Sequence, residues 1–298
     1  MSEENFKRRS RGKAFTELGL ARAEYRVGVA LLVTAAVTYS TAGLFTKAVA
    51  AGAWEVIFWR GLFSAAFTIG WTLKGGALRH NFVGIGYSGW AVAIIGALGT
   101  AAFIPAFKLT SIANVSLIYA VAPLIAATLA WWFVGERPTL RMVLGCLGAL
   151  LGVGVIVSGS LGRMSLVGDL LALWMTAAMA VIMVIYRKYP GTPGAGPAAL
   201  QSILLLPVAL ILGQPFAVDP VEIGVLAAFG LLFAIASVTL AEGAKRVPSG
   251  QTALLSALET PLAPLFAFLL LAETPTAATL LGGGIVLVAV LISMKRDA

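Results

Sequence analysis

The stretch KLTSIANVSLIYAVAPLIAATLAWWFVGERPTLRMVLG, residues 108–145, decides the fold. It contains an apolar run over residues 112–134, a polar turn of sequence GERP at 135–138, and the start of a second apolar run at Leu140. A helix needs about 20 mostly apolar residues to cross a hydrocarbon core of about 30 Å, because each residue rises about 1.5 Å. The stretch therefore predicts two membrane-spanning helices joined by a short turn.

Apolar runs of the same kind fill the rest of the chain. Hydrophobic residues make up 59% of the sequence and charged residues 11%, whereas a soluble domain carries about 25% charged residues. The runs are too long for strands, and backbone in lipid must satisfy its polar groups within each span. The sequence therefore predicts an all-α integral membrane protein with ten transmembrane helices around a central cavity. We place the spans at residues 27–49, 54–73, 88–108, 112–134, 140–158, 167–187, 197–213, 221–242, 250–272 and 277–294.

The quoted stretch is repeated later in the chain. Residues 245–282 match residues 108–145 at an offset of 137. Apolar identities carry little weight in such a composition, but the shared Glu-x-Pro-Thr motif and the prolines before it carry more. The matching pairs are Lys108/Lys245, Leu117/Leu254, Ala120/Ala257, Ala130/Ala267, Glu136/Glu273, Pro138/Pro275, Thr139/Thr276, Leu144/Leu281 and Gly145/Gly282, with Pro123/Pro261 after a slip of one residue.

This repeat predicts two halves of opposite orientation. The offset holds about five helices, and because five is odd the second copy must enter the membrane from the other side. Inverted repeats are typical of transporters, in which two similar halves exchange conformations and open a central cavity to alternate sides. A duplicated structural scaffold is the alternative. We expect a basic N-terminal tail at 1–26, a first five-helix repeat at 27–158 and a second, inverted repeat at 167–294.

The basic residues lie where membrane orientation would place them. The net charge is +8, and seven of the 21 Lys and Arg residues precede residue 27. With the N-terminus in the cytoplasm, the cytoplasmic side receives 17 Lys and Arg residues and the far side three, while Arg60 lies inside a span. We therefore expect a multi-pass protein of a bacterial-type inner membrane with both termini in the cytoplasm. A nucleic-acid partner is not expected, because the charge follows the loops rather than one face.

Motifs for several kinds of chemistry are missing from the sequence. The single cysteine, Cys146, lies in an apolar run and the single histidine, His80, in a polar gap, which leaves no disulfide or Cys-based metal cluster within the chain. There is no Walker loop, His-Glu-x-x-His motif or Cys-x-x-Cys motif. These absences argue against an ATP-driven pump, an intramembrane metalloprotease and a redox carrier. We expect no catalytic residue, no metal and no cofactor.

Short motifs in both halves complete the pattern. They are Lys47 at the end of the first span, Phe58-Trp59-Arg60, Ala113-Asn114, Pro123, Gly135-Glu136-Arg137, Leu255 to Pro261, and Ala272-Glu273-Thr274-Pro275. In order and spacing these motifs resemble the drug/metabolite transporter superfamily, specifically its EamA-type members with ten helices. The resemblance covers residues 27–294 in two copies. The sequence departs from the family at Tyr39-Ser40, where a Trp-Gly pair is frequent.

The resemblance implies an exporter or permease for amino acids, drugs or other metabolites. This chain looks closest to the branch that exports aromatic and other neutral amino acids, so we expect export of such amino acids by alternating access. A multidrug or other small-metabolite exporter is the alternative. A membrane-embedded enzyme ranks lower, because the spans offer no nucleophile–base pair or metal set, and a structural or chaperone-like protein ranks lower too. The expected partners are a small-molecule substrate and the lipid bilayer, with a monomer favoured over a homodimer.

Two charged residues inside the spans are the sharpest candidates for substrate binding. Arg60 lies about 10 Å below the outer edge of its span, and Glu259 lies in the middle of the ninth span. A charge at such depth is costly and normally faces a cavity or a partner. Arg60 could bind a substrate carboxylate or Glu259; the alternatives are snorkelling to the headgroups and pairing with Glu55. Glu259 could bind an ammonium group, take up a proton, or hold the halves together.

Uncharged residues of the spans complete the candidate set. Aromatic and methionine side chains can form an adaptable apolar pocket, although lipid contact or core packing is the commoner fate of each. Polar side chains can bind a zwitterion or a nearby backbone group. Prolines can act as hinges or only kink a helix. The binding candidates are Tyr39, Ser40, Phe58, Trp59, Phe103, Tyr119, Trp174, Met175, Gln251 and Ser256, and the hinge or gate candidates are Pro123, Pro261 and Pro264.

Overall fold

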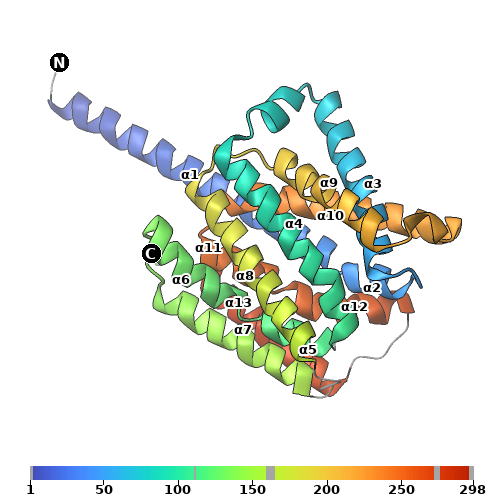
Figure 1. The fold of residues 1–298 in the computed structure, drawn as a ribbon. Coiled ribbons are helices and arrows are strands. Elements are labelled where there is room, and N and C mark those ends of the chain that lie inside the picture. The colour runs from blue at the N-terminus through green and yellow to red at the C-terminus, as the bar shows by residue number, and fades with distance from the viewer. Residues whose placement is uncertain (1–2, 111, 159–164, 272–275, 295–298) are drawn as a thin grey trace.

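A computed structural model describes residues 3–110, 112–158, 165–271 and 276–294, and within these ranges the chain forms helices and no strand (Figure 1). Glu273 lies outside the described residues, and Pro264 is described by its backbone alone. The elements are α1 (Glu3–Tyr39), α2 (Ala42–Lys47), α3 (Ala53–Lys74), η1 (Arg79–Val83), α4 (Gly86–Leu109), α5 (Ile112–Tyr119), α6 (Ala122–Val134), α7 (Leu140–Ser158), α8 (Leu166–Lys188), α9 (Ala195–Leu212), η2 (Pro215–Ala217), α10 (Pro220–Ala244), α11 (Ser249–Ser256), α12 (Glu259–Leu271) and α13 (Ala277–Met294).

The long helices confirm the predicted membrane fold. Nine helical stretches among the described residues are long and apolar enough to cross a membrane. The predicted span at 250–272 is not among the nine, and its described residues form α11 and α12. Within the described residues all ten predicted runs lie mainly on helices, so the pattern of apolar runs gives the correct fold class.

Three of the predicted spans are broken near their middle. The breaks lie between α1 and α2, between α5 and α6, and between α11 and α12. Pro123 is the second residue of α6 and Pro261 the third residue of α12. A proline fits the first turn of a helix, where its missing N–H has no partner to lose, and it cannot bond to the turn before it. The two prolines therefore mark where a new helical segment begins.

The helix boundaries confirm the internal repeat. When the numbering is shifted by 137, the first and last positions of α5 and α6 coincide with those of α11 and α12. The first position of α7 coincides with that of α13 in the same way. Equivalent helices of the two halves pack on each other, α3 on α9 and α7 on α13. Helix α4 packs along α8 of the other half, side by side in Figure 1, and α1 packs along α10 in the same way. The two halves are thus interlocked.

Glycines allow the close approach of α7 and α13. A Cβ added to Gly152 would lie 2.7 Å from the Gly282 carbonyl oxygen, and one added to Gly282 would lie 2.3 Å from the Gly152 carbonyl oxygen. In lipid, where helices gain little from burying apolar surface, such small residues let backbones come into van der Waals contact. Helices α7 and α13 therefore pack closely because glycines lie at their contact.

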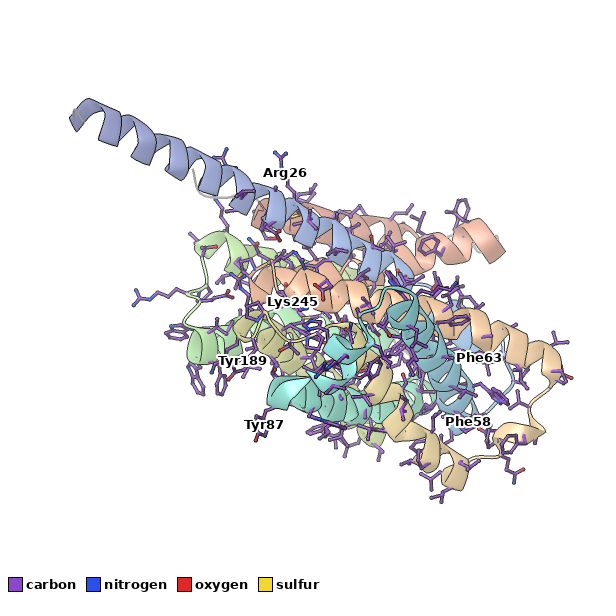
Figure 2. The ribbon with its side chains drawn as sticks, turned by 90° about the horizontal axis from the view of Figure 1, so that it is seen from above. Arg26, Phe58, Phe63, Tyr87, Tyr189 and Lys245 are labelled. Atoms are coloured by element: carbon purple, nitrogen blue, oxygen red, sulfur yellow. The ribbon has the colours of Figure 1, made fainter. Side chains whose placement is uncertain are left out.

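The bundle has two ends with different chemistry. At the first, here called the basic end, Arg187 donates a hydrogen bond to the Lys245 carbonyl oxygen and Arg246 pairs with Glu24. The second, here called the opposite end, contains the α2–α3 connection and η2. Figure 2 shows Lys245 toward the basic end and Phe58 toward the opposite end.

Candidate functional site

Arg60 is buried inside the bundle and has no carboxylate partner among the described residues. It lies on α3 and is 1% exposed. Its guanidinium carbon lies 4.0 Å from the ring centroid of Phe233 and 5.4 Å from that of Phe229, both on α10. Its Nε has no hydrogen-bond partner among the described residues, and its guanidinium makes no ion pair there. Two aromatic faces thus hold the cation, and its terminal nitrogens remain available for an anion.

Arg60 neither reaches the lipid headgroups nor pairs with Glu55. The side chain is too deeply buried to snorkel to headgroups. The Glu55 carboxylate accepts a hydrogen bond of 2.7 Å from the Gln214 backbone N–H at the opposite end, so it does not pair with Arg60. A buried guanidinium without a carboxylate is costly unless a ligand or water compensates it.

Glu259 is a second charged group without a partner in the part of the chain that the structure describes. It is the first residue of α12, directly after the break in the ninth span. Its carboxylate makes no hydrogen bond or ion pair with any described residue, and its side chain is only partly exposed. The first turn of a helix favours a negative charge, because its backbone N–H groups are unpaired. The break therefore creates a helix N-terminus inside the span, and its unpaired N–H groups stabilise the Glu259 carboxylate.

Tyr39 connects the two charged groups. It is the last residue of α1, and its hydroxyl lies 3.1 Å from the Ser237 Oγ on α10. Its ring meets Phe233 edge-on at a centroid distance of 5.9 Å. Tyr39 interacts electrostatically with both Arg60 and Glu259. Helices of both halves thus bring a cation, a carboxylate and a hydroxyl to one region.

Three further candidates form an apolar cluster beside this group. Tyr119, Met175 and Phe103 pack together with Ala102 and Ala122, on α5, α8, α4 and α6. Tyr119 also interacts electrostatically with Glu259 and with Tyr39. The polar group and the apolar cluster are therefore neighbours.

Phe58 and Trp59 pack against a second buried cluster, which contains Phe229 and extends toward the opposite end. Phe58 and Trp59 pack around Phe216 at the opposite end, where the Trp59 Nε1 donates a hydrogen bond of 2.7 Å to the Pro215 carbonyl oxygen. Trp174 is 52% exposed on the face of α8 that carries Leu170 and Leu173. These residues contact the η2 region or the surface of the bundle.

The three polar candidates make hydrogen bonds within the protein. Ser40 Oγ donates to the Val37 carbonyl oxygen and Ser256 Oγ to that of Thr252. Gln251 accepts a hydrogen bond from the Tyr25 hydroxyl and donates to the Ser293 carbonyl oxygen. Their hydrogen bonds stabilise helices and helix contacts.

The structure adds three residues that the sequence did not single out. Phe229, Phe233 and Ser237 lie four positions apart on α10 and contact Arg60 or Tyr39. Residues four apart lie on one face of a helix, and this spacing is the only feature of the sequence that groups the three residues.

At the basic end, one carboxylate joins the two halves. Glu136, just after α6, forms an ion pair with Arg187 at the end of α8. Its second oxygen accepts a hydrogen bond of 3.1 Å from the Ser249 backbone N–H at the start of α11. Nearby, a hydrogen bond to Glu242 raises the pKa of the Arg246 guanidinium above its usual value. We call the contacts of Glu136 with Arg187 and Ser249 the latch.

At the opposite end, acidic side chains accept hydrogen bonds from backbone N–H groups and from a threonine hydroxyl. Glu222 at the start of α10 accepts hydrogen bonds from Ala50, at 2.7 Å, and from Ala51, at 3.2 Å. Asp169 on α8 accepts a hydrogen bond of 2.7 Å from the Thr110 hydroxyl after α4. Both ends therefore carry contacts between the halves, but only the basic end carries an ion pair between them among the described residues.

Comparison with known proteins decides the family. Residues 26–158 and 166–295 each match the EamA-like transporter family. The chain belongs to this family. The drug/metabolite transporter superfamily, which its motifs predict, includes this family, and the multi-pass membrane fold agrees with it.

Two relatives of this EamA-like transporter are themselves named as transporters. A "Probable terminal-alkyne amino-acid exporter" of Streptantibioticus cattleyicolor is 29% identical over 193 residues, which cover 61% of this chain and 63% of that protein. An "Uncharacterized transporter YyaM" of Bacillus subtilis (strain 168) is 28% identical over 197 residues, with the same coverage. The chain thus spans less than two thirds of the length of each relative. A solved crystal structure shares the fold, with a TM-score of 0.78 and 22% identity over 90% of this chain and 96% of that one.

Proposed function

We propose that this EamA-like transporter exports amino acids, aromatic and other neutral ones, across a bacterial-type inner membrane. The observation that carries the proposal is the presence of two opposite charges, Arg60 and Glu259, that have no ion-pair partner among the described residues and both interact with Tyr39. An amino acid carries the complementary carboxylate and ammonium group on one carbon. The relative named as an amino-acid exporter supports the same substrate class.

The arrangement suggests how a zwitterion would be held. The Arg60 guanidinium, fixed against Phe233, would bind the substrate carboxylate through two parallel N–H donors. Glu259 would bind the ammonium group, and the Tyr39 hydroxyl would supply a further hydrogen bond. The apolar cluster of Phe103, Tyr119 and Met175 would take the substrate side chain, since aromatic and thioether groups adapt to varied shapes.

Alternating access would follow from the inverted repeat. By the distribution of Lys and Arg, we assign the basic end to the cytoplasm. The latch joins the halves at that end, so it must open before substrate can enter the central region from the cytoplasm. The breaks before Pro123 and Pro261 are the positions where α6 and α12 would pivot against the rest of their spans.

A multidrug or other small-metabolite exporter is the competing function. A phosphorylated metabolite would require several cations at mid-depth, and Arg60 is the one buried Lys or Arg among the described residues of the spans. An amphipathic cation would be attracted by Glu259 but repelled by Arg60. The zwitterion satisfies both charges, which is why we prefer it.

Uptake by purified protein in liposomes tests the proposal. Labelled threonine, methionine and phenylalanine would be measured for the native protein and for Arg60→Ala and Glu259→Gln, with Arg26→Ala, on the exposed surface of α1, as a control. We expect saturable uptake, competition among the three amino acids, and loss of uptake in the first two variants only. If folded native protein transports none of them but does transport a drug, the amino-acid assignment is wrong and the competing function replaces it.

A further inference from the structure

A buried polar stripe runs along α3 from Arg60 toward the basic end. Arg60, Ser64, Thr68 and Thr72 follow one another at intervals of four residues, and each is at most 5% exposed. Residues four apart lie on the same face of a helix. Twelve residues of helix extend about 18 Å, which is more than half of the hydrocarbon core. Hydroxyls at three consecutive turns of a spanning helix make a continuous polar line inside the bundle.

The stripe faces α10, and the two helices touch near its deep end. A Cβ added to Gly230 of α10 would lie 2.8 Å from the Arg60 carbonyl oxygen and 2.9 Å from the Ser64 backbone nitrogen. Toward the basic end, a cavity of about 240 Å³ separates the helices. Its polar lining comes from Thr68, Thr72, Asn81 and Glu242, and the rest of its wall is apolar, with Phe67, Trp71 and Leu231 exposed at the bundle surface. We call this cavity the α3–α10 crevice.

Two polar atoms just beyond the crevice lack a hydrogen-bond partner within the described ranges. The Ser64 Oγ and the Arg60 Nε are both buried and without a hydrogen bond among the described residues. Buried polar atoms in folded proteins are nearly always paired, and ordered water is the usual partner when no protein group is present. The Thr68 hydroxyl donates to the Ser64 carbonyl oxygen and the Thr72 hydroxyl to that of Ile69, so both oxygens can still accept from water.

We propose that water fills the α3–α10 crevice and continues along Ser64 to Arg60. Water would enter at the basic end, beside the carboxylate of Glu242, and would hydrate the guanidinium from that side. The crevice has room for several water molecules, since one needs about 15 Å³ of such space. This route is separate from the latch between α6, α8 and α11. It gives the buried cation a contact with the cytoplasm while the latch stays closed, and it does not depend on which substrate is carried.

Cysteine accessibility tests the route. In a Cys146→Ser background, which removes the single native thiol, Ser64→Cys, Thr68→Cys and Thr72→Cys would be exposed to Ag⁺ in inside-out vesicles. The control is Ala66→Cys, which lies at the same depth of α3 on an exposed face. The rate is read as protection from later labelling by a membrane-permeant maleimide. The assay requires folded protein but does not measure transport. A negative result would therefore count against the water route and not against the proposed function.

The expected result is a graded reaction. Thr72→Cys should react fastest and Ser64→Cys slowest, with each at least on the order of 100-fold faster than Ala66→Cys, because hydrocarbon excludes ions. Adding Thr68→Phe should slow Ser64→Cys to the rate of the control. If an acyl chain fills the crevice, Thr68→Cys and Ser64→Cys will react no faster than Ala66→Cys. That outcome, or an equally fast reaction from the other side of the membrane, overturns the proposal.

Discussion

At the scale of single residues, the environment of Arg60 favours a guanidinium over any other cation. Its carbon lies 4.0 Å from the Phe233 centroid, which suits a planar, weakly hydrated group. An ammonium is smaller and more strongly hydrated, and it cannot present two parallel donors to a carboxylate. The residue type therefore matters at this position as much as its charge.

We predict that Arg60→Lys keeps the charge but not the transport. Loss of the stacked, bidentate geometry should cost about 1.5–3 kcal/mol of substrate binding, so kcat/KM for phenylalanine uptake should fall about 10- to 100-fold. The same substitution at the exposed Arg26 should leave uptake unchanged. Uptake of Arg60→Lys within two-fold of the native rate would show that charge alone is recognised.

Glu259 should select substrates that carry an ammonium group. We predict that native protein prefers phenylalanine to phenylpropionate, which lacks that group, and that Glu259→Gln reduces this preference about 10-fold or more. The measurement is competition of each compound against labelled methionine. Glu24→Gln, which changes an exposed carboxylate at the basic end, is the matched control and should keep the preference. An unaltered preference in Glu259→Gln places ammonium recognition elsewhere.

The sequence identified the charged members of the candidate site better than the uncharged ones. Arg60 and Glu259 stand out because a charge in an apolar run needs a reason. Phe229 and Phe233 do not stand out, because an aromatic side chain in an apolar run can face lipid as readily as the protein interior. Polar residues such as Gln251 could bind either a substrate or protein groups, and Gln251 makes its hydrogen bonds to Tyr25 and to the Ser293 backbone. Composition cannot tell which face of a helix a residue occupies, and packing decides that.

At the scale of elements, apolar length predicts where helices lie but not where they break. The spans at 112–134 and 250–272 are each two helices in the structure, with breaks that precede Pro123 and Pro261. The prolines indicate a break, and the repeat supports its position, because both copies break at the same register. The break after Tyr39 has no proline and no counterpart in α8, so neither signal could locate it.

The contact between α7 and α13 gives a prediction for one glycine. Gly152→Leu would place side-chain atoms where a Cβ already meets the Gly282 carbonyl oxygen at 2.7 Å. Overpacking of this kind typically costs about 1–3 kcal/mol, so the midpoint of thermal unfolding in detergent should fall by several degrees. Gly154→Leu, on the same helix with nothing within 4 Å of its Cβ, should unfold like the native protein. Equal unfolding of the two variants would contradict the close approach.

At the scale of the whole molecule, the two halves are related by sequence but are used differently. The carboxylate of Glu259 falls at the position of Ala122 in the first half, and Glu136 makes the latch at the basic end. An inverted pair of halves can interconvert only if the contacts at the two ends differ little in free energy. The latch must therefore be weak enough to open.

The exposure of the latch agrees with a weak contact. The Arg187 and Glu136 side chains are 30% and 22% exposed, so solvent screens their attraction. An ion pair of this kind contributes at most about 1 kcal/mol. Removing it should therefore shift the balance between closed and open states about five-fold rather than abolish closure.

We predict that Glu136→Gln opens the basic end. The reporter is Thr252→Cys in the Cys146→Ser background, because Thr252 on α11 is fully buried while the latch is closed. Its modification by a charged thiol reagent from the cytoplasmic side should become about five-fold faster. Reversing the pair, as Glu136→Arg with Arg187→Glu, should recover part of the closure but not the hydrogen bond from Ser249.

The control for this prediction lies at the opposite end of the bundle. Glu222→Gln weakens the hydrogen bonds from Ala50 and Ala51 that join the halves there. In a molecule that rocks about its centre, loosening this end cannot favour opening of the basic end, so the reporter should react at the native rate or more slowly. A similar acceleration in Glu222→Gln and Glu136→Gln would mean that either substitution only loosens the bundle, and that the ion pair of Glu136 does not act as a latch.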